Sequence, residues 1–459
     1  MQRHLTCFGL LVVACASSAY ADNYDGYFDS GFATGGREQI DVSPGSYDLG
    51  RVLRIQPDGK LLVGGTCTWT DNFANTQPIF CATRLNGDAS LDACFGFGGS
   101  IVFDRFVAQG FPEYLPATTM ALLNDGRVLF TGSTLTDGDI WIAILTADGR
   151  ALDTTIAGNT GFIHFKYGNT ANFSTGSTVF QQSDGKILVA GNMDRNGNSG
   201  EYFDMAVQRF LPDLSVDTSF GIQGYQVVPS NFNFDITTAA TSIAVQTNGS
   251  IVLAGYEQFS PSSRYIAVVR LLQNGQPDTA FGPSHDGRER FHPANFDSAN
   301  SVRIDTQGRI VFAGYAGADT TRQTRQCFIH RLHGADGSPD LAGGYPQQFQ
   351  VPVGTTNAPC EIVDLAVQSD GNVLAVGTLL DYYFAAVKLT PGGAFDSSFG
   401  FGGKSYGSFD ASASQTYVAN GAMQIGNGGL MIAGASTASD TKFGITRLTL
   451  SKIFANGFD

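Results

Sequence analysis

The chain has 459 residues, of which 42% are hydrophobic and 15% are charged, so it is too apolar to be disordered and long enough for an extensive core. Its 27 Lys and Arg residues against 41 Asp and Glu residues give a formal charge of -14. A field of this sign repels phosphate backbones and anionic lipids, which argues against nucleic acid and membrane surfaces as partners.

The N-terminus has the features of a targeting segment. After a short basic start, Leu5 to Ala14 form an apolar run too short to span a bilayer, and Ala19 to Ala21 form a small-x-small cleavage site. We therefore expect residues 1–21 to be a signal peptide. As an alternative, the residues ending at Cys15 resemble a bacterial lipobox, which would make the protein a lipoprotein. Both interpretations predict export to the periplasm, the cell surface or the medium, and no later stretch is long enough for a transmembrane helix.

One motif recurs seven times, and its clearest copy is QSDGKILVAG, Gln182 to Gly191. In most copies Asp-Gly or Asn-Gly separates two short apolar runs rich in β-branched residues. This pattern predicts a two-residue hairpin, because both turn positions favour positive φ. The turn glycines recur about every sixty residues, at Gly59, Gly126, Gly185, Gly249, Gly308, Gly371 and Gly428.

Two further runs follow each hairpin. In the third repeat they lie in FDMAVQRF (Phe203 to Phe210) and GYQVV (Gly224 to Val228), separated by LPDLSVDTSFG (Leu211 to Gly221). The second repeat departs from this pattern, since Ile144-Leu145 replaces the basic pair and Thr155-Ile156 replaces Phe-Gly. Four strand-length runs in each repeat predict a blade of four antiparallel strands.

The repeats predict an all-β fold, a seven-bladed β-propeller that spans residues 22–450 as one domain. A β-solenoid fits less well, because its coils are shorter. The last repeat stops after FGITRLTL (Phe443 to Leu450), while the mature N-terminus holds a stray fourth run, YFDSGFATGG (Tyr27 to Gly36). We expect this N-terminal strand to complete the last blade and close the ring, which leaves no long exposed edge.

With the hairpin motif, the Arg-Leu strand end and Asp-Thr-Ser-Phe-Gly in one register, Tyr27 to Leu450 resemble the delta-60 repeat family of bacterial secreted proteins. The resemblance implies a propeller at or outside the cell surface, with no established activity or catalytic residues to carry over. The C-terminal tail, residues 451–459, resembles a short tail that ends in Gly-Phe-Glu on secreted proteins of some Gram-negative bacteria. Here Asp459 replaces the Glu.

One Asp recurs in every repeat ahead of the fourth run. A carboxylate that accepts a hydrogen bond from the backbone N–H two residues on nucleates a turn, and a residue needed in every blade is needed by the fold. We therefore interpret these residues as turn formers instead of a functional ring of carboxylates. They are Asp29, Asp92, Asp153, Asp217, Asp278, Asp340 and Asp396.

Five Cys residues lie outside the targeting segment, and export permits them to form disulfides. Cys67 and Cys81 lie on neighbouring runs of the first repeat, so an antiparallel pair could join them, with Cys94 as a competitor for Cys81. Cys327 and Cys360 form the other pair that needs no long reach.

The sequence holds no G-x-S-x-G, no H-E-x-x-H, no phosphate loop and no dinucleotide fingerprint. Propeller active sites are assembled from loops of several blades without a local signature, so two functional classes remain. We favour an exported, non-catalytic, monomeric propeller that binds a protein, peptide or glycan at the cell surface through its variable loops. The alternative is an extracellular hydrolase or lyase with an acidic axial site. The variable loops are residues 65–78, 133–139, 192–202 and 315–326.

The strongest metal candidate is a calcium site in DRNGNSGE of the third repeat. Asp194, Asn196, Asn198 and Glu201 carry oxygen atoms at alternating positions around a glycine, as in the first half of a calcium loop. The stretch lacks the distal Glu of a full loop, and a polar hairpin tip is the other interpretation. No other cofactor is expected.

This pattern predicts that calcium raises the thermal unfolding midpoint of the mature chain, residues 22–459, because a ligand that binds only the folded state stabilises it. The measurement is thermal unfolding with calcium and with a chelator. The shift should vanish in Asp194→Ala, and equal midpoints with and without calcium in the parent chain would exclude the site.

Overall fold

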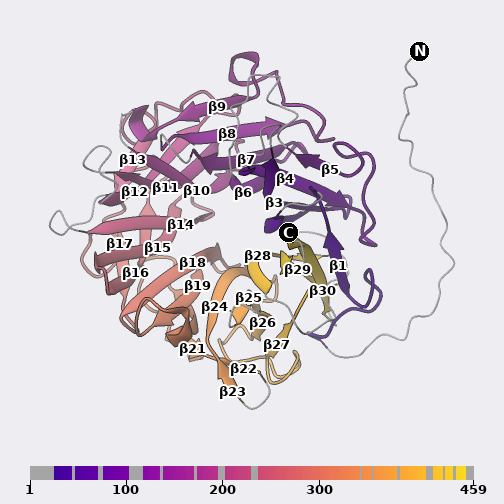
Figure 1. Cartoon of the computed structure of the whole chain (residues 1–459). Helices are drawn as coiled ribbons and strands as arrows, with labels where there is room; N and C mark the ends of the chain where they lie inside the picture. Colours follow the sequence, from indigo (N-terminus) through magenta and orange to yellow (C-terminus); the bar gives the residue numbers. More distant parts are fainter. Residues whose placement is uncertain are drawn as a thin grey trace.

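The protein folds as an all-β propeller of antiparallel sheets arranged around a common centre, in a computed structural model of the chain (Figure 1). The structure describes residues 25–43, 47–70, 76–102, 117–134, 138–169, 173–194, 202–228, 236–341, 344–353, 356–379, 383–409, 417–426, 429–437 and 441–450. The helical segments that are described in full are three short 3-10 turns: η2 (Ala157–Asn159), η3 (Tyr167–Asn169) and η4 (Arg322–Thr324).

Five sheets of the described chain are separate blades of four antiparallel strands. In each, the first strand of the hairpin motif lies nearest the centre (Figure 1). The first three are β2 (Leu49–Ile55), β3 (Leu61–Thr70), β4 (Thr76–Leu85) and β5 (Ser100–Val102); β6 (Ala117–Leu122), β7 (Val128–Ser133), β8 (Ile140–Leu145) and β9 (Phe162–Phe165); β10 (Ser174–Gln181), β11 (Ile187–Asp194), β12 (Phe203–Phe210) and β13 (Tyr225–Val228). The others are β24 (Cys360–Val367), β25 (Val373–Leu379), β26 (Tyr383–Leu389) and β27 (Lys404–Gly407); β28 (Tyr417–Gly426), β29 (Gly429–Thr437) and β30 (Thr441–Thr449) with β1 (Arg37–Ile40).

The expected count of seven separate blades is wrong for the described chain, which has five, because the fourth and fifth repeats share one eight-stranded sheet. A single parallel bridge between Arg264 and Phe296 joins the two halves of this sheet. Only residues 292–295 connect the halves, so the chain stays close enough for the Arg264 N–H to donate to the Asn295 carbonyl at 2.9 Å. The strands are β14 (Thr237–Val245), β15 (Ile251–Ser260), β16 (Ser263–Leu271), β17 (Arg288–Phe291), β18 (Phe296–Ile304), β19 (Ile310–Gly317), β20 (Gln326–Leu332) and β21 (Gln347–Phe349).

A small extra hairpin, which the repeat pattern does not predict, follows this sheet. It pairs β22 (Val351–Val353) with β23 (Thr356–Ala358) in a two-stranded sheet of its own. The hairpin lies between the fifth and sixth repeats and inserts no strand into either of their sheets.

The hairpin turns form at the expected places but with a different conformation. In the first repeat the Gly59 N–H donates to the Gln56 carbonyl at 2.8 Å, and the Lys60 N–H donates to the Asp58 carboxylate at 3.1 Å. Within this turn only Gly59 has a positive φ, at 82°. The prediction that both turn residues have a positive φ is therefore wrong. Pro57 fixes φ near -65° at the first turn position, and the glycine alone takes the left-handed conformation.

The recurrent Asp forms its turn as the sequence predicts. The Asp217 Oδ1 accepts a hydrogen bond from the backbone N–H of Ser219 at 3.1 Å, and its Oδ2 binds Arg209 Nε at 2.8 Å and Lys186 Nζ at 3.2 Å. The interpretation as turn formers is therefore confirmed where this hydrogen bond recurs. It recurs at Asp29, Asp92, Asp153, Asp278 and Asp396.

The same cluster joins its sheet to the next one. Arg209 also donates to the carbonyl of Gln273 in the following repeat at 2.8 Å, and the Gly221 N–H donates to the Asn274 carbonyl at 2.7 Å. The Phe220 ring lies against Gly275, where an added Cβ would be 2.8 Å from the ring. A side chain at Gly275 would therefore force the two sheets apart.

The N-terminal residues complete the last sheet, although the strand begins later than expected. β1 pairs with β30 from Arg37 to Ile40, whereas the expected strand, residues 27–36, mostly forms the Asp turn that precedes it. Asp29 Oδ2 binds Arg447 Nε at 2.7 Å, and the Asp25 carbonyl accepts the Gly400 N–H at 2.8 Å. The N-terminal segment therefore contacts both of the last two sheets.

Removing the carboxylate of Asp217 leaves Arg209 buried without its ion-pair partner. We expect Asp217→Ala to lower the free energy of unfolding by about 2 to 3 kcal/mol, since breaking a fully buried pair costs about 3 to 5 kcal/mol and Lys186 is partly exposed. Urea denaturation measures the change. The matched control is Asp213→Ala, whose carboxylate bonds only to Ser215 in an exposed turn. If the two variants lose equal free energy of unfolding, Asp217 acts only as a turn former.

Acid should weaken these clusters in a defined pH range. Desolvation raises the pKa of Asp217, but hydrogen bonds from Ser219 and the charge of Arg209 outweigh it and lower the pKa to about 2. A carboxylate with a lowered folded-state pKa stabilises the fold above its unfolded pKa of about 3.9, and this contribution disappears as the pH falls towards 2. The difference in unfolding midpoint between the parent chain and Asp217→Asn should therefore be constant above about pH 5 and shrink between pH 4 and 2. A constant difference across that range would contradict the lowered pKa.

Candidate functional site

Each innermost strand for which the pairing is described in full carries a one-residue bulge at the same place. In β10 the register shifts between Gly176 and Thr178, opposite Gly191, the last glycine of the hairpin motif. An added Cβ at Gly191 would overlap the carbonyl oxygen of Thr175, so the bulge requires this glycine. The bulged residues are Arg51, Thr118, Ser177, Thr241, Asn300 and Val363.

Three of the bulged side chains bridge to the following repeat. The Thr118 hydroxyl donates to the Gly176 carbonyl at 2.7 Å, and the Thr241 hydroxyl donates to the Ala299 carbonyl at 2.7 Å. The Asn300 amide donates to the Ile362 carbonyl at 2.8 Å. Because each acceptor directly precedes the next bulge, these bonds align neighbouring innermost strands around the centre.

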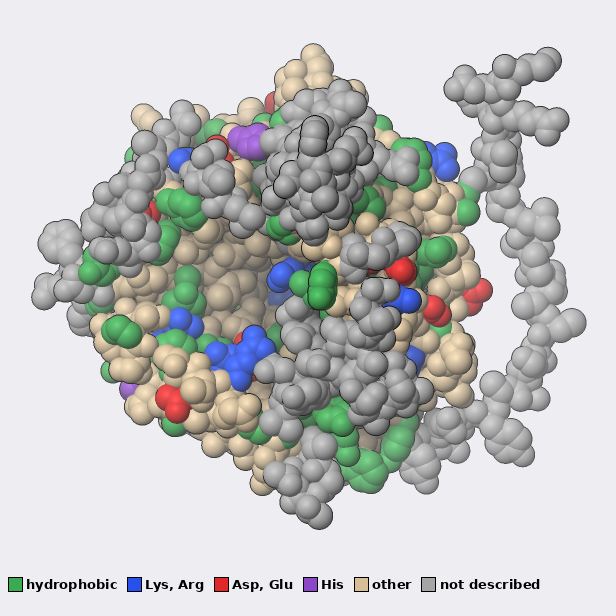
Figure 2. All heavy atoms as spheres, in the orientation of Figure 1, with side chains coloured by type: hydrophobic (Ala, Val, Ile, Leu, Met, Phe, Trp, Pro, Cys, Tyr) green, Lys and Arg blue, Asp and Glu red, His purple; other side chains and the backbone are tan. Residues whose placement is uncertain are grey.

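Six innermost strands, β2, β6, β10, β14, β18 and β24, surround a central cavity of about 860 Å³. Figure 2 shows the hollow at the centre of the molecule, with basic side chains beside it. In each strand the same three positions line the cavity and form three tiers. The bulged residue belongs to the first tier, the residue after it to the second, and the residue two positions further on to the third. The second tier is Val52, Thr119, Thr178, Ser242, Ser301 and Asp364; the third is Arg54, Ala121, Phe180, Ala244, Arg303 and Ala366.

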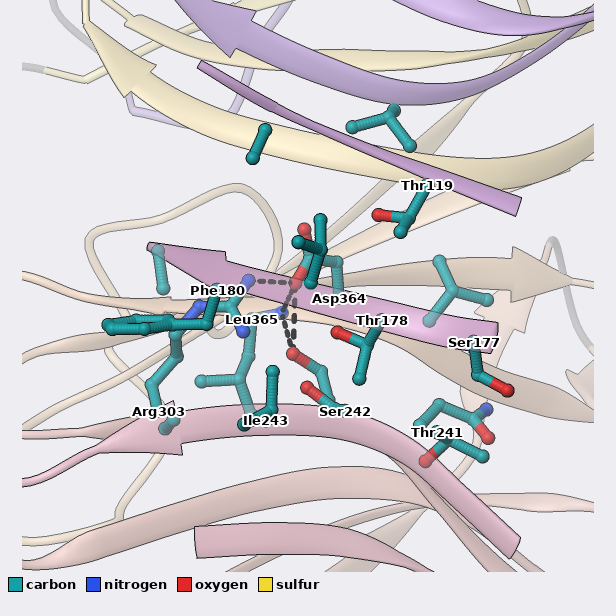
Figure 3. A pocket seen from close by; sticks show the side chains of 18 of the residues that line it. Thr119, Ser177, Thr178, Phe180, Thr241, Ser242, Ile243, Arg303, Asp364 and Leu365 are labelled. Atoms are coloured by element: carbon teal, nitrogen blue, oxygen red, sulfur yellow. Dashed lines mark hydrogen bonds and ion pairs between the residues drawn. The ribbon is translucent and has the colours of Figure 1, made fainter. Parts of the chain in front are cut away.

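Hydroxyl groups dominate the wall formed by β6, β10 and β14. Thr119, Ser177, Thr178, Thr241 and Ser242 lie along this wall in Figure 3. A hydroxyl both donates and accepts hydrogen bonds, so a wall of this kind suits a ligand with several polar groups. Thr241 already donates to the Ala299 carbonyl and is left to accept, whereas Ser242 accepts from the Val302 N–H and is left to donate. The partly buried ring of Phe180, one tier further in, adds an apolar surface.

The two described carboxylates of the cavity lining are both engaged by cations. Asp364 Oδ1 accepts hydrogen bonds from Ser301 Oγ at 2.9 Å and Arg303 Nη2 at 2.6 Å (Figure 3). Glu361 forms an ion pair with Arg325 and accepts a hydrogen bond from Asn300 at 2.9 Å. The described lining also holds three Arg residues, so basic and acidic side chains lie together in the cavity.

Arg51 and Arg54 differ from Arg303 because neither has an ion-pair partner among the described residues. Arg54 Nη1 donates only to the carbonyl of the neighbouring Leu53, at 2.8 Å. Burial lowers the pKa of Arg54, although attraction to Asp364 opposes the shift, and the Arg303 charge adds to it. Desolvation by the surrounding walls also lowers the pKa of Arg51, whose side chain remains accessible to solvent. The two guanidinium groups therefore bring positive charge into the cavity.

Of the calcium candidate only Asp194 belongs to the described residues, and it is not part of the cavity lining. Asp194 ends β11, where its backbone N–H donates to the Phe173 carbonyl at 2.7 Å and its side chain is buried. Asn196, Asn198 and Glu201 lie outside the described residues. Within the described ranges no group of three or more His, Cys, Asp or Glu residues could hold a metal ion. The calcium site stays a prediction.

The structure joins the candidate cysteines in two disulfides. Cys67 on β3 bonds to Cys81 on β4 with an S–S distance of 2.02 Å, so Cys81 is not available to Cys94. Cys327 on β20 bonds to Cys360 at the start of β24 and thereby ties two different sheets together. In the described part of the chain, no helix is long and apolar enough to cross a membrane.

Among the variable loops, residues 315–326 are described and carry η4, whereas 71–75, 135–137 and 195–201 of the other three lie outside the described residues. Sequence reasoning missed the cavity lining itself. The available signal was the glycine that ends every copy of the hairpin motif, because in the described strands that glycine marks the bulge opposite it.

Comparisons with known proteins support a propeller repeat family. A family model described as a domain of unknown function (DUF5122) beta-propeller matches residues 56–95, 182–220, 246–281 and 368–399. Each match begins at the Gln before a hairpin turn and ends at the Phe of Phe-Gly, so the matches follow the repeat. No curated protein matches the sequence.

Several solved structures are similar to the chain at low identity. Polysaccharide lyase Uly1 is 11% identical, with 92% of this chain and 96% of that chain covered and a TM-score of 0.48. Penicillium chrysogenum alpha-L-arabinanase is 14% identical over 74% of this chain and 93% of that chain, with a TM-score of 0.41. Trypanosoma rangeli sialidase is 8% identical over 91% of this chain and 60% of that chain, with a TM-score of 0.40. Similarities this weak carry no argument about activity.

Proposed function

We propose that the protein is an exported, non-catalytic propeller of the delta-60 type that binds a polar ligand in its central cavity. The observation that carries the proposal is the wall of hydroxyl groups on β6, β10 and β14. These side chains converge from three sheets on one space of a size that suits a small ligand. The variable loops would form the rim of this site and contribute to the choice of partner.

Export is part of the proposal. The Cys67–Cys81 and Cys327–Cys360 disulfides support it, because disulfides persist in oxidising compartments outside the cytoplasm. The predicted signal peptide, residues 1–21, would direct the chain there.

We further propose that the blades number seven and form a closed ring. The eight-stranded sheet contains two hairpin motifs and two of the recurrent Asp residues, Asp278 and Asp340, and one residue pair joins its halves, which supports counting it as two blades. The pairing of β1 with β30 and the packing of β2 against β28 bring the first and last repeats together. A closed ring would fix the diameter of the cavity.

An extracellular hydrolase or lyase remains the second candidate, because Glu361 and Asp364 both line the cavity. Their ion pairs weigh against free acid and base roles. A general acid or base must contact the proton that it transfers, and an Arg side chain already engages an oxygen of each carboxylate.

The proposal predicts that filling the cavity abolishes ligand binding. Thr178→Trp should place an indole in the cavity, while Thr320→Trp adds the same ring to an exposed loop and serves as the control. The measurement is the thermal unfolding midpoint with a panel of hexoses, hexuronates, their short oligomers and short peptides. At least one compound should raise the midpoint of the parent chain and of Thr320→Trp but not that of Thr178→Trp.

Two outcomes would overturn this function. Stabilisation of Thr178→Trp equal to that of the parent chain would place the binding site elsewhere. Cleavage of a panel compound by the parent chain, lost in Asp364→Asn, would establish the enzyme alternative instead.

A further inference from the structure

The two unpaired arginines of the cavity both come from β2. The tier formed by the bulged residues carries Thr, Ser, Thr and Asn on β6, β10, β14 and β18, and β2 carries Arg51 in that place. In the third tier β6, β14 and β24 carry alanine, and β2 carries Arg54. One side of the cavity therefore presents two guanidinium groups next to a wall of hydroxyls.

Arg303, which lies in the same tier as Arg54, has a structural role. Its guanidinium binds Asp364 on the adjacent innermost strand at 2.6 Å and donates to the Val302 carbonyl at 2.8 Å. It therefore ties β18 to β24. Arg54 makes only the equivalent backbone bond, to Leu53, and Arg51 makes no hydrogen bond or ion pair within the described residues. Neither Arg51 nor Arg54 ties β2 to a carboxylate in the described chain.

Arg51 is exposed and Arg54 is partly exposed, so a bound anion can reach both guanidinium groups, and an anion offsets the cost of removing the Arg54 charge from water. The planar fork of Arg matches the two oxygens of a carboxylate, and paired forks add charge-assisted hydrogen bonds. The neighbouring Ser and Thr hydroxyls suit a ligand rich in hydroxyl groups, and the Phe180 ring suits an apolar C–H face. Carboxylate and hydroxyl groups occur together in sugar acids.

We propose that Arg51 and Arg54 bind the carboxylate of an acidic sugar, a hexuronate or an oligomer of it, in the central cavity. The hydroxyl tiers of β6, β10 and β14 hold the sugar ring, and the arginines select the acid over the neutral hexose. This inference rests on the proposed binding function and names the ligand class of the same site.

The test compares pairs of sugars that differ only at the carboxylate. Affinities of the parent chain for glucuronate and glucose, and for galacturonate and galactose, are measured by calorimetry. Each hexuronate should bind at least about tenfold more tightly than its hexose, since a hydrogen bond between charged groups is stronger than one between neutral groups. This preference should weaken as salt is added.

Arg51→Gln and Arg54→Gln should each weaken hexuronate binding about tenfold and leave hexose binding unchanged. Arg322→Gln removes the same charge from the exposed turn η4 and should behave as the parent chain. Arg54→Lys keeps the charge without the fork and should fall between the parent and Arg54→Gln. Unchanged thermal midpoints establish that each variant is folded.

Failure of the parent chain to bind hexuronates would overturn the inference. So would a double variant, Arg51→Gln/Arg54→Gln, that keeps the parent's preference for hexuronate over hexose. Tighter binding of glucose 6-phosphate than of glucuronate would overturn it as well. Its failure can be separated from that of the proposed function. Equal binding of acid and hexose that Thr178→Trp blocks would remove only the acid preference. Binding that Thr178→Trp leaves intact would remove the cavity as the site.

Discussion

The fold depends on the contact that each sheet makes with the next. A four-stranded sheet of this length buries little by itself, and the core of the protein lies between neighbouring sheets. Leu188 and Met205 of one sheet pack in a single cluster with Leu253 and Val269 of the next. At the outer end of this contact, the Asp217 carboxylate holds Arg209 while the guanidinium bonds to the following repeat. Because the same few residues form the turn, the ion pair and the bond between sheets, they recur in almost every repeat.

The central cavity follows from the same constraint. Bulges opposite the motif glycines turn one residue of each innermost strand, and short side chains there align the strands through hydrogen bonds to the next carbonyl. Among the described residues of this tier, Thr118, Thr241 and Asn300 make such a bond. Arg51 and Val363 occupy the same tier in different sheets, which shows how widely that tier varies. A ligand site on such a scaffold arises from side-chain choice at positions that the backbone already provides.

The sequence predicts the parts of the structure that are local. The turn at Gly59, the hydrogen bonds of the recurrent Asp and the four-stranded antiparallel blades all follow from short patterns, because a few neighbouring residues determine them. The cavity could not be predicted in this way. Arg51 and Arg54 are three positions apart, and in a regular strand such residues point to opposite faces. The bulge at Arg51 shifts the alternation by one residue and brings both into the cavity. Likewise, the fusion of two repeats depends on where Phe296 of β18 pairs with Arg264 of β16, a contact between separate strands.

The charge of the whole chain sets how the proposed site would act. With a formal charge of -14, the protein repels an approaching anion, so long-range attraction does not assist association. At physiological salt this repulsion is screened over about 8 Å, and within that distance Arg51 and Arg54 dominate the field that a ligand meets. Selection for an acidic sugar would therefore arise after entry, from contacts that slow dissociation. In that case the preference for the acid lies in the dissociation rate, which is where related complexes usually differ.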